Sequence, residues 1–167
     1  DKFREECGIF GIHNNPDAAA ITALGLHALQ HRGQEAAGIV TKNNDQFHLE
    51  KRIGLVGDNF SKKSVIDKLP GNYAIGHNRY STTGAPMLRN VQPLYADLSF
   101  GGLTICHNGN LTNAQQLKEN LVKDGSIFHT TSDTEVIIHL LAKSKKSNFI
   151  DKLVEALSKV VGAYSFL

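Results

Sequence analysis

A cysteine near the start of the chain, Cys7, carries the most distinctive chemistry in the sequence. It follows Glu6 and opens an apolar run over residues 7–12 (CGIFGI), which predicts a buried strand. One cleavage between Glu6 and Cys7 would leave a thiol nucleophile and an α-amine base on one residue, a pairing that supports nucleophilic catalysis. The alternative for Cys7 taken alone is a small apolar thiol buried in the core.

A second polar segment, residues 76–84 (GHNRYSTTG), begins in a predicted strand over residues 73–80 and continues into a loop. Such strand-to-loop junctions often carry functional side chains. The planar guanidinium of Arg79 could bind a carboxylate through two parallel hydrogen bonds. A surface salt bridge is the alternative for Arg79.

Two more segments offer groups that bind charge. Residues 107–110 (HNGN) join a predicted strand to a helix, and the Asn108 amide with the Gly109 N–H could form an oxyanion hole. A plain turn is the alternative, because Asn-Gly is a common turn pair. In residues 131–135 (TSDTE), Asp133 either caps a helix or binds an ammonium group. A nucleophile, an oxyanion hole, a carboxylate binder and an ammonium binder together fit free glutamine.

The elements that must position these groups alternate between strands and helices. Strands are predicted over residues 7–12, 37–42, 46–51, 73–80, 94–98 and 103–107, with the last two joined around Gly101-Gly102. Helices are predicted over residues 15–31, 61–69, 112–125, 132–142 and 148–161; Thr112 with Gln115 and Ser132 with Glu135 form capping boxes. This pattern predicts an α+β layered fold. Residues 163–167 resemble the start of a strand, so we expect further strands beyond Leu167.

Composition restricts the class of protein. The 167 residues suit one domain, with 41% hydrophobic residues, 20% charged residues and a net charge of +2. No basic and aromatic stripe suggests nucleic-acid binding, and no apolar run is long enough for a membrane span. The two cysteines, Cys7 and Cys106, lie far apart, which is typical of a protein from the reducing cytoplasm. Cys106 is predicted to be a core residue.

Five segments together resemble the glutaminase domain of class II glutamine amidotransferases, which are N-terminal-nucleophile hydrolases. The segments are residues 7–11 (CGIFG), 29–39 (LQHRGQEAAGI), 76–82 (GHNRYST), 107–111 (HNGNL) and 131–135 (TSDTE). The resemblance implies a four-layer αββα sandwich. It also implies a propeptide-like leader over residues 1–6 and a glutaminase domain over residues 7–167 that is incomplete at its C-terminus, with the phosphoribosyltransferase domain absent.

Within that family, residues 31–35 (HRGQE) and Gln92-Pro93 are most similar to the amidophosphoribosyltransferases of purine synthesis. This similarity implies glutamine hydrolysis through a cysteine thioester, which supplies ammonia for 5-phosphoribosylamine formation, the first step of purine synthesis. Two alternatives stay open. One is the glutaminase domain of another class II enzyme such as glucosamine-6-phosphate synthase, and the other is an inactive relative that binds an amino acid.

The resemblance assigns the catalytic groups by position. Cys7 is the nucleophile, its freed α-amine is the base, and Asn108 with Gly109 forms the oxyanion hole. The rival mechanism is a Cys–His dyad in which His77 or His107 activates Cys7. That dyad would need no N-terminal processing.

The resemblance also assigns the groups that bind substrate. Arg79 binds the α-carboxylate of glutamine, with Thr82 nearby, and Asp133 binds the α-ammonium. Arg32 and Tyr80 link the glutamine loop to the rest of the site.

No cofactor is expected within this region. The resemblance places Mg, and in some members an iron–sulfur cluster, in the part of the full-length enzyme outside it. His27 and His31 are spaced as a metal pair on a helix, but no third ligand is evident, and we expect them to favour the helix C-terminus instead. The expected partners are L-glutamine and the phosphoribosyltransferase domain, with no nucleic acid and no membrane, in a homo-oligomer when the protein is full length.

Overall fold

The computed structural model describes residues 7–80 and 87–167. Its strands are β1 (Cys7–His13), β2 (Ala36–Asn43), β3 (Gln46–Ile53), β4 (Tyr73–Arg79), β5 (Leu94–Leu98), β6 (Gly101–Ile105), β7 (His107–Leu111) and β8 (Gly162–Phe166). Its helices are α1 (Ala18–Ala28), α2 (Val56–Phe60), α3 (Lys63–Ile66), α4 (Ala114–Lys123), α5 (Glu135–Lys143) and α6 (Phe149–Leu157), with 3₁₀ turns η1 (Gln30–Arg32) and η2 (Leu88–Asn90).

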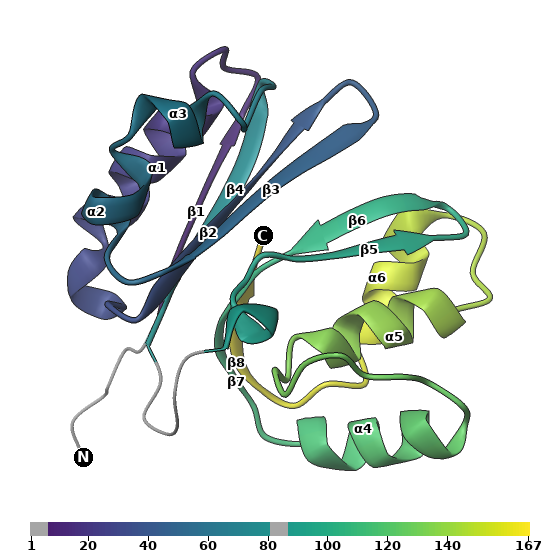
Figure 1. Ribbon diagram of the computed structural model, residues 1–167. Coiled ribbons are helices and arrows are strands. Elements are labelled where there is room, and N and C mark those ends of the chain that lie inside the picture. The colour runs from purple at the N-terminus through teal and green to yellow at the C-terminus, as the bar shows by residue number, and fades with distance from the viewer. Residues whose placement is uncertain (1–6, 81–86) are drawn as a thin grey trace.

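The first half of the chain forms a four-stranded antiparallel sheet in the order β1-β4-β2-β3. Helices α1, α2 and α3 cover one face of this sheet (Figure 1). A core of small and branched side chains fills the interface, including Ala23, Leu26, Ile39, Val56 and Phe60. β2 is buried along nearly its whole length because both of its faces are covered.

The second half pairs β5 with β6 and β7 with β8, both antiparallel. Helices α4, α5 and α6 pack against these strands through a second core that includes Leu94, Ile105, Val136, Ile137 and Leu141. In Figure 1 the two groups of helices lie on opposite outer sides, with the strands between them. The layers therefore run helix, sheet, sheet, helix, which confirms the predicted αββα sandwich.

The two strand layers also contact each other. The Cys106 thiol donates to the Gly76 carbonyl across 3.6 Å, and the Gln92 carbonyl lies where a Cβ on Gly38 would have to be. Gly38 therefore lets the η2–β5 connection approach β2 closely. This approach brings the loops of the second half over the end of the first sheet.

Several predicted boundaries were wrong. Leu98 pairs with Gly101, so the β5–β6 turn lies before the Gly-Gly pair and not around it. Residues 107–110 form part of strand β7 and not a turn. The reason is that β8 pairs with them, and the local sequence pattern does not predict this partner. Helix α1 ends at Ala28 and is followed by η1.

The predicted helix start at residue 15 and the capping box at Thr112 were also wrong. The Asn15 side chain accepts from the Asp17 N–H in a turn that precedes α1. Thr112 donates to the Val161 carbonyl, and α4 begins after Asn113. The proposed leader, residues 1–6, lies outside the described residues.

Candidate active site

The strand register brings the proposed nucleophile beside the proposed carboxylate binder. Cys7 opens β1 and Arg79 closes β4, and the two are direct partners in the antiparallel pair. The Nε of Arg32, at the end of η1, donates to the Cys7 carbonyl across 2.8 Å. Residues more than 20 positions apart in sequence therefore meet at one end of the first sheet.

A pocket of about 340 Å³ opens at this end. Cys7, Arg79, Tyr80, Gly109 and Asp133 all line it, so it gathers five of the eight site residues named from the sequence. Arg32 does not line it but contacts the Cys7 backbone, and Thr82 lies outside the described residues. The other lining residues are His77, Asn90, Gln92, His107, Asn110, Thr131 and Ser132.

Asn108 stands apart from this group. It lies on β7 next to Gly109 and is half-buried, but it is not one of the residues that line the pocket. Gly109 itself has φ +140°, and a Cβ there would collide with the Ala163 carbonyl of β8. The close pairing of β7 with β8 therefore requires glycine at this position.

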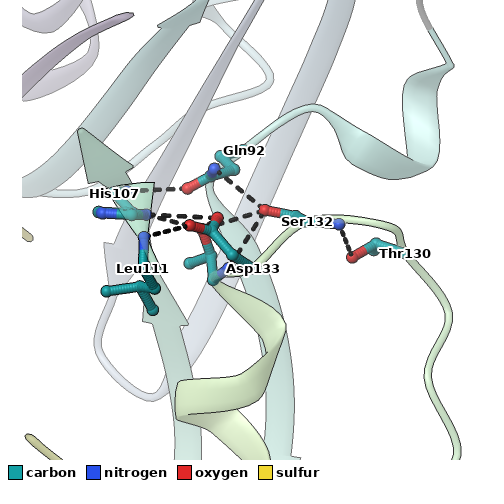
Figure 2. Close-up of polar contacts among 7 residues, drawn as sticks. Gln92, His107, Leu111, Thr130, Ser132 and Asp133 are labelled. Carbon is teal, nitrogen blue, oxygen red and sulfur yellow. Dashed lines mark hydrogen bonds and ion pairs between the residues drawn. The ribbon is translucent and has the colours of Figure 1, made fainter. Parts of the chain in front are cut away.

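The edge of β7 that faces away from β8 holds hydrogen-bond donors toward the pocket. Cys106 and Leu167 exchange both backbone hydrogen bonds, which fixes the phase of the ladder. By the alternation of an antiparallel pair, residues 107, 109 and 111 direct their N–H groups to the opposite edge. The N–H of His107 donates to Gln92 Oε1 across 2.8 Å, and that of Leu111 donates to Asp133 Oδ2 across 3.1 Å (Figure 2).

Gly109 lies midway between these two anchored residues. Its N–H belongs to the same edge, and Gly109 lines the pocket that holds Cys7. The Gly109 N–H is therefore a backbone donor held between two anchored neighbours, as an oxyanion hole would require.

Asp133 does not cap a helix. One carboxylate oxygen accepts from Leu111, and the other lies 3.5 Å from His107 Nδ1 and 3.5 Å from the Thr134 hydroxyl. Burial raises the pKa of Asp133, but hydrogen bonds from His107 and from the Leu111 N–H outweigh burial, so the pKa lies below its usual value. Asp133 is therefore a carboxylate at neutral pH and faces the pocket as a fixed negative charge.

Arg79 supplies the opposite charge. Its Nη1 is fully buried and has no hydrogen-bond partner among residues 7–80 and 87–167. A buried donor without a partner is costly, so an anion that reaches this nitrogen gains a favourable contact. The pocket therefore has a positive wall at Arg79, a negative wall at Asp133 and a thiol between the strand ends.

Two buried histidines, His77 and His107, also line the pocket. Burial, and secondarily the nearby His107 and Arg79, lowers the pKa of His77 to about 3. His77 is therefore neutral at physiological pH and a weak base. His107 holds its Nδ1 against Asp133 and Thr134.

Asn90 and Gln92 form one wall of the pocket, although neither was predicted from the sequence to be a site residue. Both side chains are buried and hydrogen-bonded to the segment before α5. The spacing of these two residues could have indicated their shared role. Their carboxamides flank the fully buried Val91, so an extended backbone there directs both to one side.

Other features lie away from this chemistry. A larger cavity of about 1010 Å³ opens at the opposite ends of β1 and β4 and contains none of the predicted site residues. Cys106 is fully buried, and burial raises the pKa of its thiol to about 12. Within residues 7–80 and 87–167, no group of three or more His, Cys, Asp or Glu side chains is placed to hold a metal ion. In the same part of the chain, no helix is long and apolar enough to cross a membrane.

The chain is similar to known amidophosphoribosyltransferases. Amidophosphoribosyltransferase from Rhizobium etli is 52% identical over 167 residues, covering 100% of this chain and 34% of that protein. Amidophosphoribosyltransferase 3, chloroplastic, from Arabidopsis thaliana is also 52% identical over 167 residues, with 100% of this chain and 31% of that protein covered. This chain thus spans about a third of the length of these relatives.

Two solved structures are also similar to this chain. The glutamine phosphoribosylpyrophosphate amidotransferase from B. subtilis, complexed with ADP and GMP, superposes with a TM-score of 0.87 at 45% identity, over 95% of this chain and 34% of that one. A structure described as the allosteric regulatory enzyme of purine biosynthesis gives a TM-score of 0.90 at 45% identity, with the same coverage. The profile of the glutamine amidotransferase domain family matches residues 77–167, more than half of the sequence. The chain belongs to the glutamine amidotransferase domain family.

Proposed function

We propose that this chain hydrolyses L-glutamine through a γ-glutamyl thioester on Cys7. The observation that carries the proposal is the meeting of Cys7, Arg79, the Gly109 edge of β7 and Asp133 in one pocket. Their charges and donors match the two ends and the reacting carbonyl of one glutamine molecule. Family membership supports the same chemistry.

The ends of glutamine set its orientation. Its α-carboxylate pairs with Arg79, whose buried Nη1 lacks a partner among the described residues, and its α-ammonium pairs with Asp133. These two contacts place the side-chain amide toward Cys7 and β7. Arg32 fixes the Cys7 backbone through the Cys7 carbonyl.

The reaction then proceeds in two steps. The α-amine of a processed Cys7 accepts the thiol proton, and the sulfur attacks the amide carbon of glutamine. The Gly109 N–H stabilises the oxyanion, and the family resemblance adds the amide of its neighbour Asn108, although Asn108 is not among the residues that line the pocket. The amine returns its proton to the leaving nitrogen, ammonia departs, and water hydrolyses the thioester to glutamate and free Cys7.

We further propose that the full-length protein transfers this ammonia to form 5-phosphoribosylamine. Relatives at 52% identity bear the name amidophosphoribosyltransferase and are about three times as long as this chain, which supports a phosphoribosyltransferase domain as the partner. Any Mg or iron–sulfur requirement then belongs to that domain. Neither Cys7 nor Cys106 forms a disulfide, which supports a reducing compartment such as the cytoplasm, and the full-length protein is proposed to be a homo-oligomer.

Glutamate and phosphoribosylamine production by the full-length protein tests both proposals. Glutamate release from glutamine tests the hydrolysis, and its coupling to consumption of phosphoribosyl pyrophosphate tests the transfer. Absence of glutamate release from protein that begins at Cys7 would refute the first proposal. Glutamate release without any phosphoribosyl transfer would refute the second alone.

A further inference from the structure

The wall of the pocket formed by residues 90–92 has no assigned role. Asn90 closes η2, and its side chain is only 5% exposed. Its Oδ1 accepts from the Thr131 N–H, and its Nδ2 donates to the Thr131 hydroxyl, each across 3.0 Å. One carboxamide therefore holds both the backbone and the side chain of a residue two positions before Asp133.

Gln92 makes a different pair of contacts. Its Oε1 accepts from the His107 N–H across 2.8 Å, and its Nε2 donates to the Ser132 hydroxyl across 3.4 Å (Figure 2). Its own carbonyl packs against Gly38 of β2. Gln92 therefore connects the first sheet, the start of β7 and the segment that carries Asp133.

These contacts fix the parts of the site that substrate would touch. The Gly109 N–H depends on where β7 begins, and Gln92 holds that beginning through His107. The carboxylate of Asp133 depends on the path of residues 131–132, which both carboxamides hold. Neither carboxamide needs to touch the reacting atoms to affect the reaction.

We propose that Asn90 and Gln92 are positioning residues for glutamine hydrolysis, an inference that rests on the proposed function. Asn90 sets the place of the ammonium-binding Asp133, and Gln92 sets the register of the oxyanion-binding edge of β7 as well. Substitutions of the two residues are predicted to have different kinetic effects. Loss of Asn90 should weaken glutamine binding, whereas loss of Gln92 should also slow the chemical step.

Steady-state kinetics of the full-length protein test this separation, with active sites counted by a glutamine-mimicking electrophile. Asn90→Ala should raise KM roughly tenfold and change kcat by less than about threefold, because ammonium binding is made in the ground state. Gln92→Met, which keeps side-chain length, should lower kcat by roughly 10–10²-fold, because a misplacement near 1 Å at the reacting centre costs that much. Arg89→Ala is the control, since Arg89 is exposed on the same turn and should leave both constants unchanged.

If Asn90 and Gln92 had a purely structural role, the variants would have a lower thermal unfolding midpoint but an unchanged KM and an unchanged kcat per active site. That result would overturn the inference. If the Asn90 and Gln92 variants do not fold, Thr131→Val tests the inference instead. Thr131 is exposed, and the substitution removes one of its two hydrogen bonds with Asn90. It should raise KM about threefold with kcat unchanged; an unchanged KM would refute the inference. If the wild-type protein itself does not turn over glutamine, that result refutes the proposed function and not the positioning roles.

Discussion

Replacement of Arg79 should separate glutamine binding from glutamine chemistry. Arg79 ends β4 opposite Cys7, and its buried Nη1 has no partner among the described residues. Arg79→Ala removes the positive wall of the pocket and leaves Cys7, β7 and Asp133 in place. Because the α-carboxylate is bound equally in the ground state and the transition state, KM should rise while kcat stays nearly constant.

The magnitude follows from the contact that is lost. Each hydrogen bond to a charged group contributes about 1.5–3 kcal/mol, so a two-bond guanidinium–carboxylate pair at the lower limit is worth about 3 kcal/mol. One factor of ten corresponds to about 1.4 kcal/mol, so KM should rise by roughly 10²-fold. Arg79→Lys retains the charge without the two-pronged donor, and we expect roughly a tenfold rise.

The assay measures ammonia release against glutamine concentration for wild type, both Arg79 variants and the exposed Arg89→Ala control. Glutamine methyl ester adds a second control, because it lacks the carboxylate charge. Its KM should be nearly the same for wild type and Arg79→Ala. The assignment is refuted if Arg79→Ala leaves the KM for glutamine unchanged, or if the variant weakens the ester as strongly as glutamine.

Three further predictions concern other groups of the site. A glutamine-mimicking electrophile should add one adduct on Cys7 and none on Cys106, because burial raises the pKa of the Cys106 thiol to about 12; peptide mapping that finds Cys106 labelled would contradict this. Asn108→Ala should lower kcat by roughly 10²–10³-fold with little change in KM, since the oxyanion exists only after attack; a rise in KM alone would remove Asn108 from that role. Asp133 has a lowered pKa in the folded protein, so its contribution to stability is full above its unfolded value of about 3.9 and is lost as pH falls through the lowered folded value. Urea unfolding from pH 7 to pH 3 should therefore show a smaller acid loss for Asp133→Asn than for wild type, and equal losses would show that the contacts of Asp133 do not stabilise the fold.

The sequence was sufficient for the layers and for most of the pocket. Apolar periodicity and glycine positions predicted strands and helices near their observed places, because both halves bury a continuous core. Cys7 and Arg79 were assigned to one site from their chemistry and from family resemblance, and the register of β1 with β4 explains why they meet.

What the sequence could not predict depends on long-range pairing. Residues 107–110 look like a turn because Asn-Gly favours turns locally, yet β8, some 55 residues later, pairs with them. Asp133 looks like a helix cap for the same reason, although its carboxylate accepts from Leu111 on β7. Asn90 and Gln92 were not assigned to the site, because their partners are backbone and hydroxyl groups of distant segments.

Cys7 is proposed to act with its own α-amine, and the turnover of two N-terminal forms of the protein checks this. One form begins at Cys7, and the other retains residues 1–6 through Glu6→Pro, with both N-termini verified by intact mass. A positioned general base contributes roughly 10²–10⁴-fold, so the retained form should be at least about 10²-fold slower. The rate of the trimmed form should rise with pH as the amine, with a pKa near 8, loses its proton. Equal turnover by both forms would show that the α-amine is not the base and would favour a dyad of Cys7 with His107, since the pKa of about 3 makes His77 a weak base.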